Sequence, residues 1–107
     1  MNMWIDVKGA SGATYRYQLA ENARPRTAVS GAFLYVREAP QLEIVYAGQA
    51  LNLSEGSTEL WHQAVRDYGA THLYTRLNVA SAVREAELAD LLDAVKPPMN
   101  EALAAQS

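Results

Sequence analysis

The chain has 107 residues, half of them hydrophobic, which is typical of one domain with a single small core. No stretch approaches the roughly 18 to 20 consecutive apolar residues that cross a bilayer, and the first residues lack a secretory pattern, so we expect no membrane partner. Cysteine is absent, which excludes disulfides, thiolate zinc sites and cysteine nucleophiles and fits a cytoplasmic protein. The net charge of −3 argues against strong, non-specific binding of nucleic acid.

The charge is unevenly distributed along the chain. Residues 1–30 contain four basic and two acidic side chains, whereas residues 79–107 contain two basic and five acidic ones. A mixed, solvated surface is the ordinary interpretation of such a pattern, and a positive patch on the N-terminal part is the alternative.

Two strands joined by a tight turn are predicted at the N-terminus. Residues 3–8 read as one strand and residues 14–19 alternate as a second, with a glycine-containing turn between them, which indicates a β-hairpin. Residues 20–30 show no clear period and are predicted as a loop. A second hairpin follows, with strands at 31–37 and 42–47 and a proline-containing turn between them.

The second half of the chain is predicted as helices that alternate with one strand. Ser57 is the expected N-cap of a first helix, and Gly69 is its expected terminator. Residues 71–77 alternate as a further strand of the main sheet. Ser81 is the expected N-cap of a second helix, which the prolines beginning at Pro97 end.

The predicted fold is therefore an α+β domain, a small antiparallel sheet flanked by helices, with an extra N-terminal β-hairpin. That hairpin either extends the sheet or packs beside it. We expect a single domain over residues 1–107, made of a hairpin and loop (1–30), a core (31–100) and a C-terminal tail (101–107), with a last short helix at 98–105.

Two glycine-marked segments carry the most specific signal in the sequence. Gly31-Ala32-Phe33 opens the first strand of the second hairpin, and Tyr46-Ala47-Gly48 closes its second strand. Leu51-Asn52-Leu53 follows, and Pro97-Pro98-Met99-Asn100 stands near the end of the chain. In this order and spacing the segments resemble the two halves and the closing element of the GIY-YIG nuclease family, over residues 31–100.

This resemblance implies a nucleic-acid phosphodiesterase that uses one divalent metal, Mg²⁺ or Mn²⁺. In that family a tyrosine at the position of Tyr46 helps to activate water, and a second tyrosine assists it. An arginine stabilises phosphate charge, a glutamate binds the metal, and an asparagine, matched here by Asn100, supports the site. The helix that contains His62 often carries a histidine or tyrosine near the cleft of the family, which makes His62 a candidate site residue.

Three positions depart from the family pattern. Phe33 replaces the second tyrosine, Gly56 stands where the arginine is expected, and Leu88 stands where the metal-binding glutamate is expected. Glu87 is one residue away, about 100° around a helix, and is the candidate metal ligand.

Packing alone offers an ordinary interpretation for several aromatic residues. Phe33 and Tyr35 are expected on opposite faces of their strand, with one of them in the core. Tyr46 is expected to pack its ring and place its hydroxyl at the surface. Trp61 and Tyr68 fall in a helical stripe that is typical of core residues.

The sequence leaves three hypotheses open for the function. The favoured one is a binding or accessory module with little or no nuclease activity, whose ligand is a nucleic acid or a protein partner. The alternative is a divergent divalent-metal-dependent DNA endonuclease, which needs a displaced arginine beside the catalytic tyrosine. Arg76, Arg66 and Arg37 are the candidates for that arginine. The third is a small assembly protein in which the hairpin of residues 3–19 pairs with another copy to form a homodimer.

Overall fold

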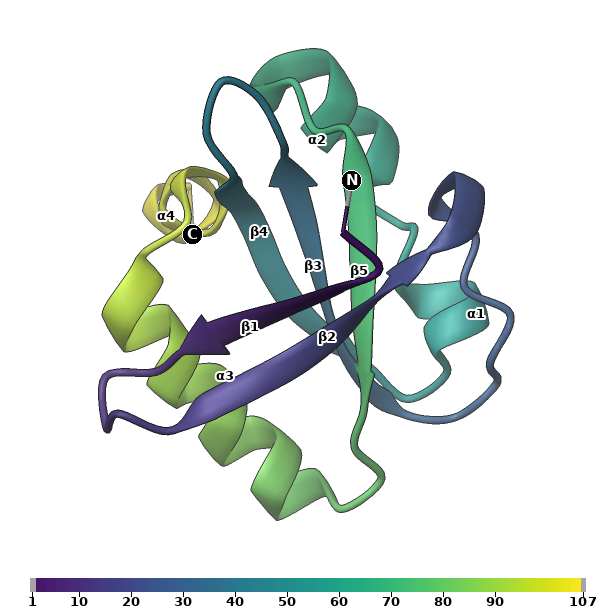
Figure 1. The fold of residues 1–107 in the computed structure, drawn as a ribbon, viewed down its shortest axis with the longest axis vertical. Coiled ribbons are helices and arrows are strands. Elements are labelled where there is room, and N and C mark those ends of the chain that lie inside the picture. The colour runs from purple at the N-terminus through teal and green to yellow at the C-terminus, as the bar shows by residue number, and fades with distance from the viewer. Residues whose placement is uncertain (1, 107) are drawn as a thin grey trace.

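The computed structural model describes residues 2–106 and shows an α+β fold, as the sequence predicts (Figure 1). Within these residues, five strands form one antiparallel sheet, with helices between and beside them. The elements in chain order are β1 (Trp4–Lys8), β2 (Thr14–Ala20), the 3₁₀ turn η1 (Glu21–Ala23), β3 (Gly31–Arg37), β4 (Glu43–Ala50), α1 (Leu53–Gly56), α2 (Trp61–Tyr68), β5 (His72–Leu77), α3 (Ser81–Val95) and α4 (Pro98–Ala105). None of the described helices has the length and apolar content needed to span a membrane.

The N-terminal hairpin extends the sheet. The strand order is β1-β2-β5-β3-β4, so the hairpin joins the other strands through β2 and β5. Their register pairs Gln18 with Thr75 and Ala20 with Leu73. Of the two arrangements that the sequence left open, extension of the sheet is therefore the one observed.

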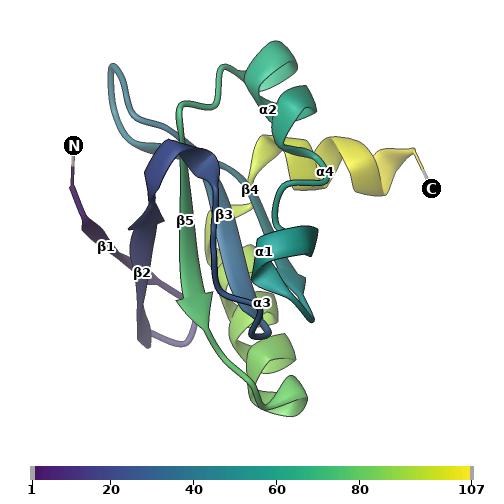
Figure 2. The ribbon, with the colours of Figure 1, turned by 90° about the vertical axis from the view of Figure 1, so that its right-hand side faces the viewer.

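The two faces of the sheet bury separate hydrophobic clusters. On the face that we call the α3 face, all five strands contribute side chains, and Leu91 of α3 packs among them with Leu34 and Tyr74. On the opposite face, which we call the α2 face, residues of α1, α2 and α4 pack around Tyr35 and Leu73. Figure 2 shows α1 and α2 on the same side of β3 and β5. The sheet therefore separates two buried environments.

Strand β3 lies between two neighbours, and both of its faces are covered. Leu34 belongs to the cluster of the α3 face, whereas Phe33 and Tyr35 both belong to that of the α2 face. The expectation that Phe33 and Tyr35 lie on opposite faces is wrong, because side chains two residues apart in a strand point the same way.

The helix predicted from Ser57 is shorter than expected, and a separate short helix, α1, precedes it. α1 begins earlier, where the Asn52 side chain accepts a hydrogen bond of 3.0 Å from a backbone N–H of the first turn. Ser57 is buried and follows α1, and its hydroxyl donates to a backbone carbonyl of that helix, so it is not the expected N-cap. α2 begins only at Trp61, and it ends at Gly69 as predicted, with a left-handed φ of 71°.

Other boundaries also differ from the prediction. Ser81 is the first residue of α3 rather than its cap, because the extended residue before the helix is Ala80 and no side chain caps it. β4 continues past Gly48 to Ala50. The loop predicted at 20–30 contains the short turn η1.

One carboxylate on α3 fastens the β1–β2 turn to the helix. Asp90 accepts hydrogen bonds from the backbone N–H and hydroxyl of Ser11, at 2.8 and 2.7 Å, and from the Tyr15 hydroxyl at 2.7 Å. Gly9 permits this approach, since a Cβ at that position would lie 2.0 Å from Asp90 Oδ2. The hydrogen bond from Tyr15, followed by those from Ser11, lowers the pKa of Asp90.

We expect Asp90→Asn to lower the thermal stability at pH 7, because an amide cannot accept all three hydrogen bonds. The pKa of Asp90 is lowered on folding, so its stabilisation is present above the unfolded pKa of about 3.9 and is lost as the pH falls through the folded value. The difference in Tm between wild type and variant should therefore narrow in acid. Circular dichroism melting curves from pH 7 to pH 2 test this, with exposed Asp93→Asn on the same helix as control. A difference that grows in acid contradicts the assignment.

Candidate functional site

Four aromatic rings form a continuous cluster on the α2 face. Phe33 and Tyr35 come from β3, Tyr46 comes from β4, and Trp61 opens α2. The Tyr35 ring stacks on Tyr46 with centroids 5.4 Å apart, and Phe33 lies 5.4 Å from Tyr35 and 6.0 Å from Tyr46. Trp61 meets Tyr35 edge-on at 5.3 Å. Aromatic pairs of this geometry contribute about 0.5 to 1.5 kcal/mol each beyond their buried area, so this cluster fixes β3, β4 and α2 together.

Glycine at position 48 leaves the space that two of these rings occupy. The strand register places Gly48 opposite Phe33. A Cβ on Gly48 would lie 2.8 Å from Phe33 Cζ and 2.9 Å from Tyr46 Cε2. Gly31 is equally constrained, since a Cβ there would lie 2.3 Å from the carbonyl oxygen of Arg76. Both glycines of the sequence motif are thus required by close packing in this sheet.

The partly buried Tyr46 has a phenol that is a poor general base. Burial raises its pKa, and the negative charge of Glu59 raises it further. Among residues 2–106 its hydroxyl has no hydrogen-bond partner. Burial and the charge of Glu59 both favour the neutral phenol. A neutral phenol can donate a hydrogen bond but does not take a proton from water near pH 7.

The second tyrosine of the cluster has a structural hydrogen bond. Tyr35 is fully buried, and its hydroxyl donates to the carbonyl oxygen of Ser57 at 2.6 Å. Burial is also the main cause that raises the pKa of Tyr35. This hydroxyl therefore holds the connection between α1 and α2 against β3.

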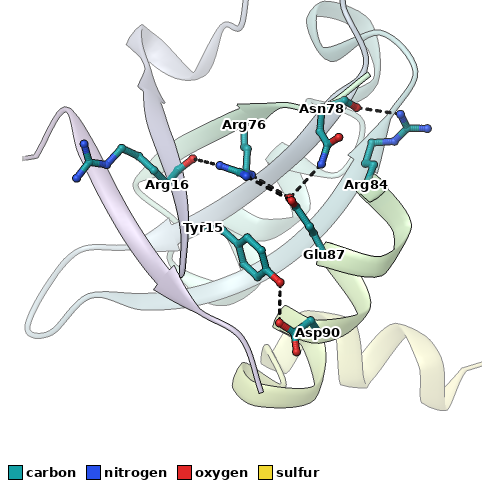
Figure 3. A network of polar contacts seen from close by, with 7 residues as sticks. All are labelled: Tyr15, Arg16, Arg76, Asn78, Arg84, Glu87 and Asp90. Atoms are coloured by element: carbon teal, nitrogen blue, oxygen red, sulfur yellow. Dashed lines mark hydrogen bonds and ion pairs between the residues drawn. The ribbon is translucent and has the colours of Figure 1, made fainter. Parts of the chain in front are cut away.

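Arg76 and Glu87 form an ion pair on the α3 face (Figure 3). Arg76 Nε lies 2.9 Å from Glu87 Oε1, and Nη2 lies 3.3 Å from Oε2. The Asn78 amide donates to the same Oε1 at 3.0 Å. The guanidinium also lies 5.5 Å from the centre of the Tyr15 ring and donates to the carbonyl oxygen of Arg16 at 3.3 Å. These contacts occupy the charged groups of both residues and join α3 to β2 and β5.

The ion pair and the aromatic cluster lie on opposite faces of the sheet. Arg76 pairs with Ala32, which faces α3, whereas the adjacent residue Phe33 faces α2. Glu87 reaches Arg76 from α3 itself. The structure thus brings Arg76 to Glu87 and Phe33 to Tyr46, and the sheet separates the two pairs.

The carboxylate of Glu87 does not fit the role of a metal ligand. Both of its oxygens accept hydrogen bonds, two from Arg76 and one from Asn78. In the part of the chain that the structure describes, no three His, Cys, Asp or Glu side chains are grouped so as to hold a metal ion. The divalent metal that the resemblance implies therefore has no matching set of ligands here.

Gly56 and Leu88, the other two departures from the family pattern, have roles in packing. Gly56 ends α1, and a Cβ at that position would lie 2.8 Å from the Cβ of Ala50. An arginine therefore cannot occupy position 56 unless the helix or β4 shifts. Leu88 packs against the cluster of the α3 face, where a glutamate would be buried among apolar side chains.

Asn100 contacts the backbone of β4, one residue before Gly48. Its Oδ1 accepts from the N–H of Ala47 at 2.8 Å, and its Nδ2 donates to the carbonyl oxygen of Ala47 at 2.8 Å. β4 is an edge strand, so these two backbone groups have no strand partner on that side. The Asn100 amide takes the place of a neighbouring strand at this point. Backbone pairing therefore explains why asparagine stands at position 100, without a catalytic role.

The remaining candidates lie on the surface. His62 is exposed on α2. Arg66 pairs with the adjacent Asp67 at 2.9 Å, and Arg37 pairs with Glu43 at 2.9 Å. Neither arginine donates a hydrogen bond to the tyrosine of the aromatic cluster that the alternative hypothesis requires.

Sequence reasoning missed one buried charge, that of Arg84. This residue is only 4% exposed, and its Nε donates to Gln49 Oε1 at 2.8 Å (Figure 3 shows its bond to Asn78). Its Nη1 donates to the carbonyl oxygens of Asn78 and Val79 at 3.0 and 3.2 Å. Arg84 therefore ties the end of β4 to the loop that precedes α3. Its one sequence signal is its position four residues before Leu88, on the buried stripe of the helix.

The cluster of Phe33, Tyr35, Tyr46 and Trp61, packed over Gly48, is the candidate site that best matches the sequence motif. Comparisons with protein-family models, with curated proteins and with solved structures find no match to this chain.

We predict that Gly48→Ala destabilises the fold by about 1 to 3 kcal/mol, because the new methyl group displaces two aromatic rings. Gly48→Ala should lower the free energy of unfolding by less in a Phe33→Leu background, since leucine lacks the ring atom closest to the new methyl group. Urea unfolding of the two single variants and the double variant measures the coupling. Strictly additive costs would show that the rings do not depend on this glycine.

We predict that Asn100→Asp destabilises the fold by about 1 to 3 kcal/mol, because a carboxylate cannot donate to the carbonyl oxygen of Ala47. Glu101→Gln, an exposed change in the same helix, should alter the free energy of unfolding by no more than about 0.5 kcal/mol. Chemical denaturation of both variants provides the measurement. Equal stability of Asn100→Asp and wild type excludes the proposed backbone pairing.

Proposed function

We propose that this chain is a GIY-YIG-like domain that binds a ligand and has little or no nuclease activity. The observation that carries the proposal is the separation of Tyr46 from the Arg76–Glu87 ion pair by the sheet. Phosphodiester hydrolysis requires a base, a stabilising cation and a metal ligand within reach of one phosphate group. Groups on opposite faces of a sheet do not meet this requirement.

The residues that carry the resemblance have structural roles in this fold. Gly31 and Gly48 allow close packing, and Asn100 pairs with the backbone of β4. Such roles persist whether or not a domain is catalytic. They support a retained architecture as the reason for the motif.

The groups expected to carry the chemistry are absent or engaged elsewhere. Tyr46 has a raised pKa, Gly56 has no room for an arginine, and both oxygens of Glu87 accept hydrogen bonds. Loss of one stabiliser of transition-state charge alone costs about 10²- to 10³-fold in rate. These features together support a binding or accessory role.

The ligand that we propose is a nucleic acid or a protein partner, in the cytoplasm. Arg24 and Arg26 are exposed, and their guanidinium groups have no ion-pair or hydrogen-bond partner within residues 2–106, which supports an anionic ligand. Strand β1 forms an open edge of the sheet, which supports pairing with a second copy or with a partner strand.

A cleavage assay tests the proposal. Supercoiled plasmid and single-stranded DNA are incubated with the purified chain and Mg²⁺ or Mn²⁺, and Tyr46→Phe is the matched control. We expect no cleavage above that of Tyr46→Phe, because wild type lacks an assembled catalytic set.

The divergent endonuclease hypothesis makes the opposite prediction for the same assay. It requires metal-dependent cleavage that both Tyr46→Phe and Glu87→Ala abolish, while Glu85→Ala on the exposed side of α3 leaves it intact. That result would overturn the proposal.

A further inference from the structure

A cavity of about 630 Å³ opens where the N-terminal hairpin meets the rest of the domain. Its walls come from Met3, the end of β2 with η1 (residues 19–23), Trp61, and Thr71-His72 at the start of β5. The volume lies within the range of about 300 to 1,000 Å³ that is typical of small-molecule sites. The N-terminal segment and the end of β2 supply part of its wall, and neither Arg76 nor Glu87 lines it.

One wall is apolar and includes a rigid aromatic ring. Met3, Leu19 and Ala23 contribute aliphatic surface, and Trp61 contributes its indole. The indole is held edge-on against Tyr35, which is itself buried. This wall is formed before any ligand arrives, so binding does not have to order it.

A second wall is polar, and hydrogen bonds connect its side chains to the neighbouring strand and loop. The Thr71 hydroxyl donates to the carbonyl oxygen of Val36 at 3.3 Å and accepts from the N–H of Glu38 at 3.0 Å. His72 Nδ1 lies 2.8 Å from the same hydroxyl and 3.4 Å from the Glu38 carboxylate. These contacts hold the His72 ring beside the cavity, between the Thr71 hydroxyl and the Glu38 carboxylate.

The backbone beside the cavity adopts an uncommon conformation. Asn22 and Ala23 have φ values of 54° and 53°, in the left-handed region. Asparagine tolerates this region, whereas alanine rarely adopts it. Residues of this kind gather at ligand sites and switch segments. Here they turn the chain so that Ala23 packs toward the cluster of the α2 face.

The charges around the cavity favour a cationic ligand. Glu21 lines it, and neither lysine nor arginine does so among the described residues. We propose that the cavity binds a small aromatic amine, with its ring against Trp61 and its ammonium group directed to Glu21. An indole face also attracts cations directly, which adds to the preference. This inference does not depend on the proposed nucleic-acid or protein ligand.

Three matched probes test the inference by ¹H–¹⁵N NMR titration of the full chain. They share a phenyl ring and a two-carbon or shorter linker but differ in charge, namely phenethylamine, 2-phenylethanol and phenylacetate. We expect phenethylamine to shift the Trp61 indole and the Ala23 and His72 amide signals, with saturation. Phenylacetate should bind at least about tenfold more weakly than phenethylamine. The proposal is overturned if phenethylamine and phenylacetate bind equally well. It is also overturned if the shifted signals lie outside the cavity, or if no probe gives a saturable shift.

Two variants separate the roles of ring and charge. Trp61→Leu keeps an apolar side chain and should weaken all probes that bind. Glu21→Gln, an exposed change that leaves the core untouched, should weaken phenethylamine at least about threefold and leave 2-phenylethanol unchanged. Glu55→Gln, exposed and outside the cavity, should have no effect. If Trp61→Leu does not fold, Glu21→Gln decides, and unchanged phenethylamine affinity in that variant refutes the charge assignment.

Discussion

Aromatic side chains packed directly on the backbone at Gly48 are the constraint on which the rest of this structure depends. With no Cβ in the way, the rings of Phe33 and Tyr46 close over β4, and Tyr35 stacks beside them. Tyr35 in turn anchors the α1–α2 connection through its hydroxyl, and it supports the indole of Trp61. One small residue therefore determines where two helices lie and how the wall of the adjoining cavity is formed.

Much of the fold could be predicted from the sequence because its signals are local. Strand alternation and the glycine or proline turns predicted both hairpins to within a few residues of their observed ends. They also predicted the α+β class. The start of the first helix could not be predicted, since Asn52 and Ser57 are both good capping residues. In the structure the Ser57 hydroxyl donates to the backbone of α1, and its carbonyl oxygen accepts from the distant Tyr35, a contact that no local pattern encodes.

The candidate site was harder to predict because it depends on topology. The sequence could place Glu87 one residue from a family position, but not on a face of the sheet. That face follows from the strand order, in which β5 lies between β2 and β3 and α3 covers the side that Arg76 faces. The buried guanidinium of Arg84 was missed for a related reason, since neutral oxygens from three separate residues satisfy it.

The two edges of the sheet differ in how far their outer backbone groups are already paired. At β4 the Asn100 amide already occupies the backbone groups of Ala47, so that edge is closed at this point to an incoming strand. At β1 no described element pairs with the outer side. The Asn100 amide therefore makes the β4 edge less accessible to an incoming strand at Ala47, whereas the outer backbone groups of β1 have no strand partner among the described residues.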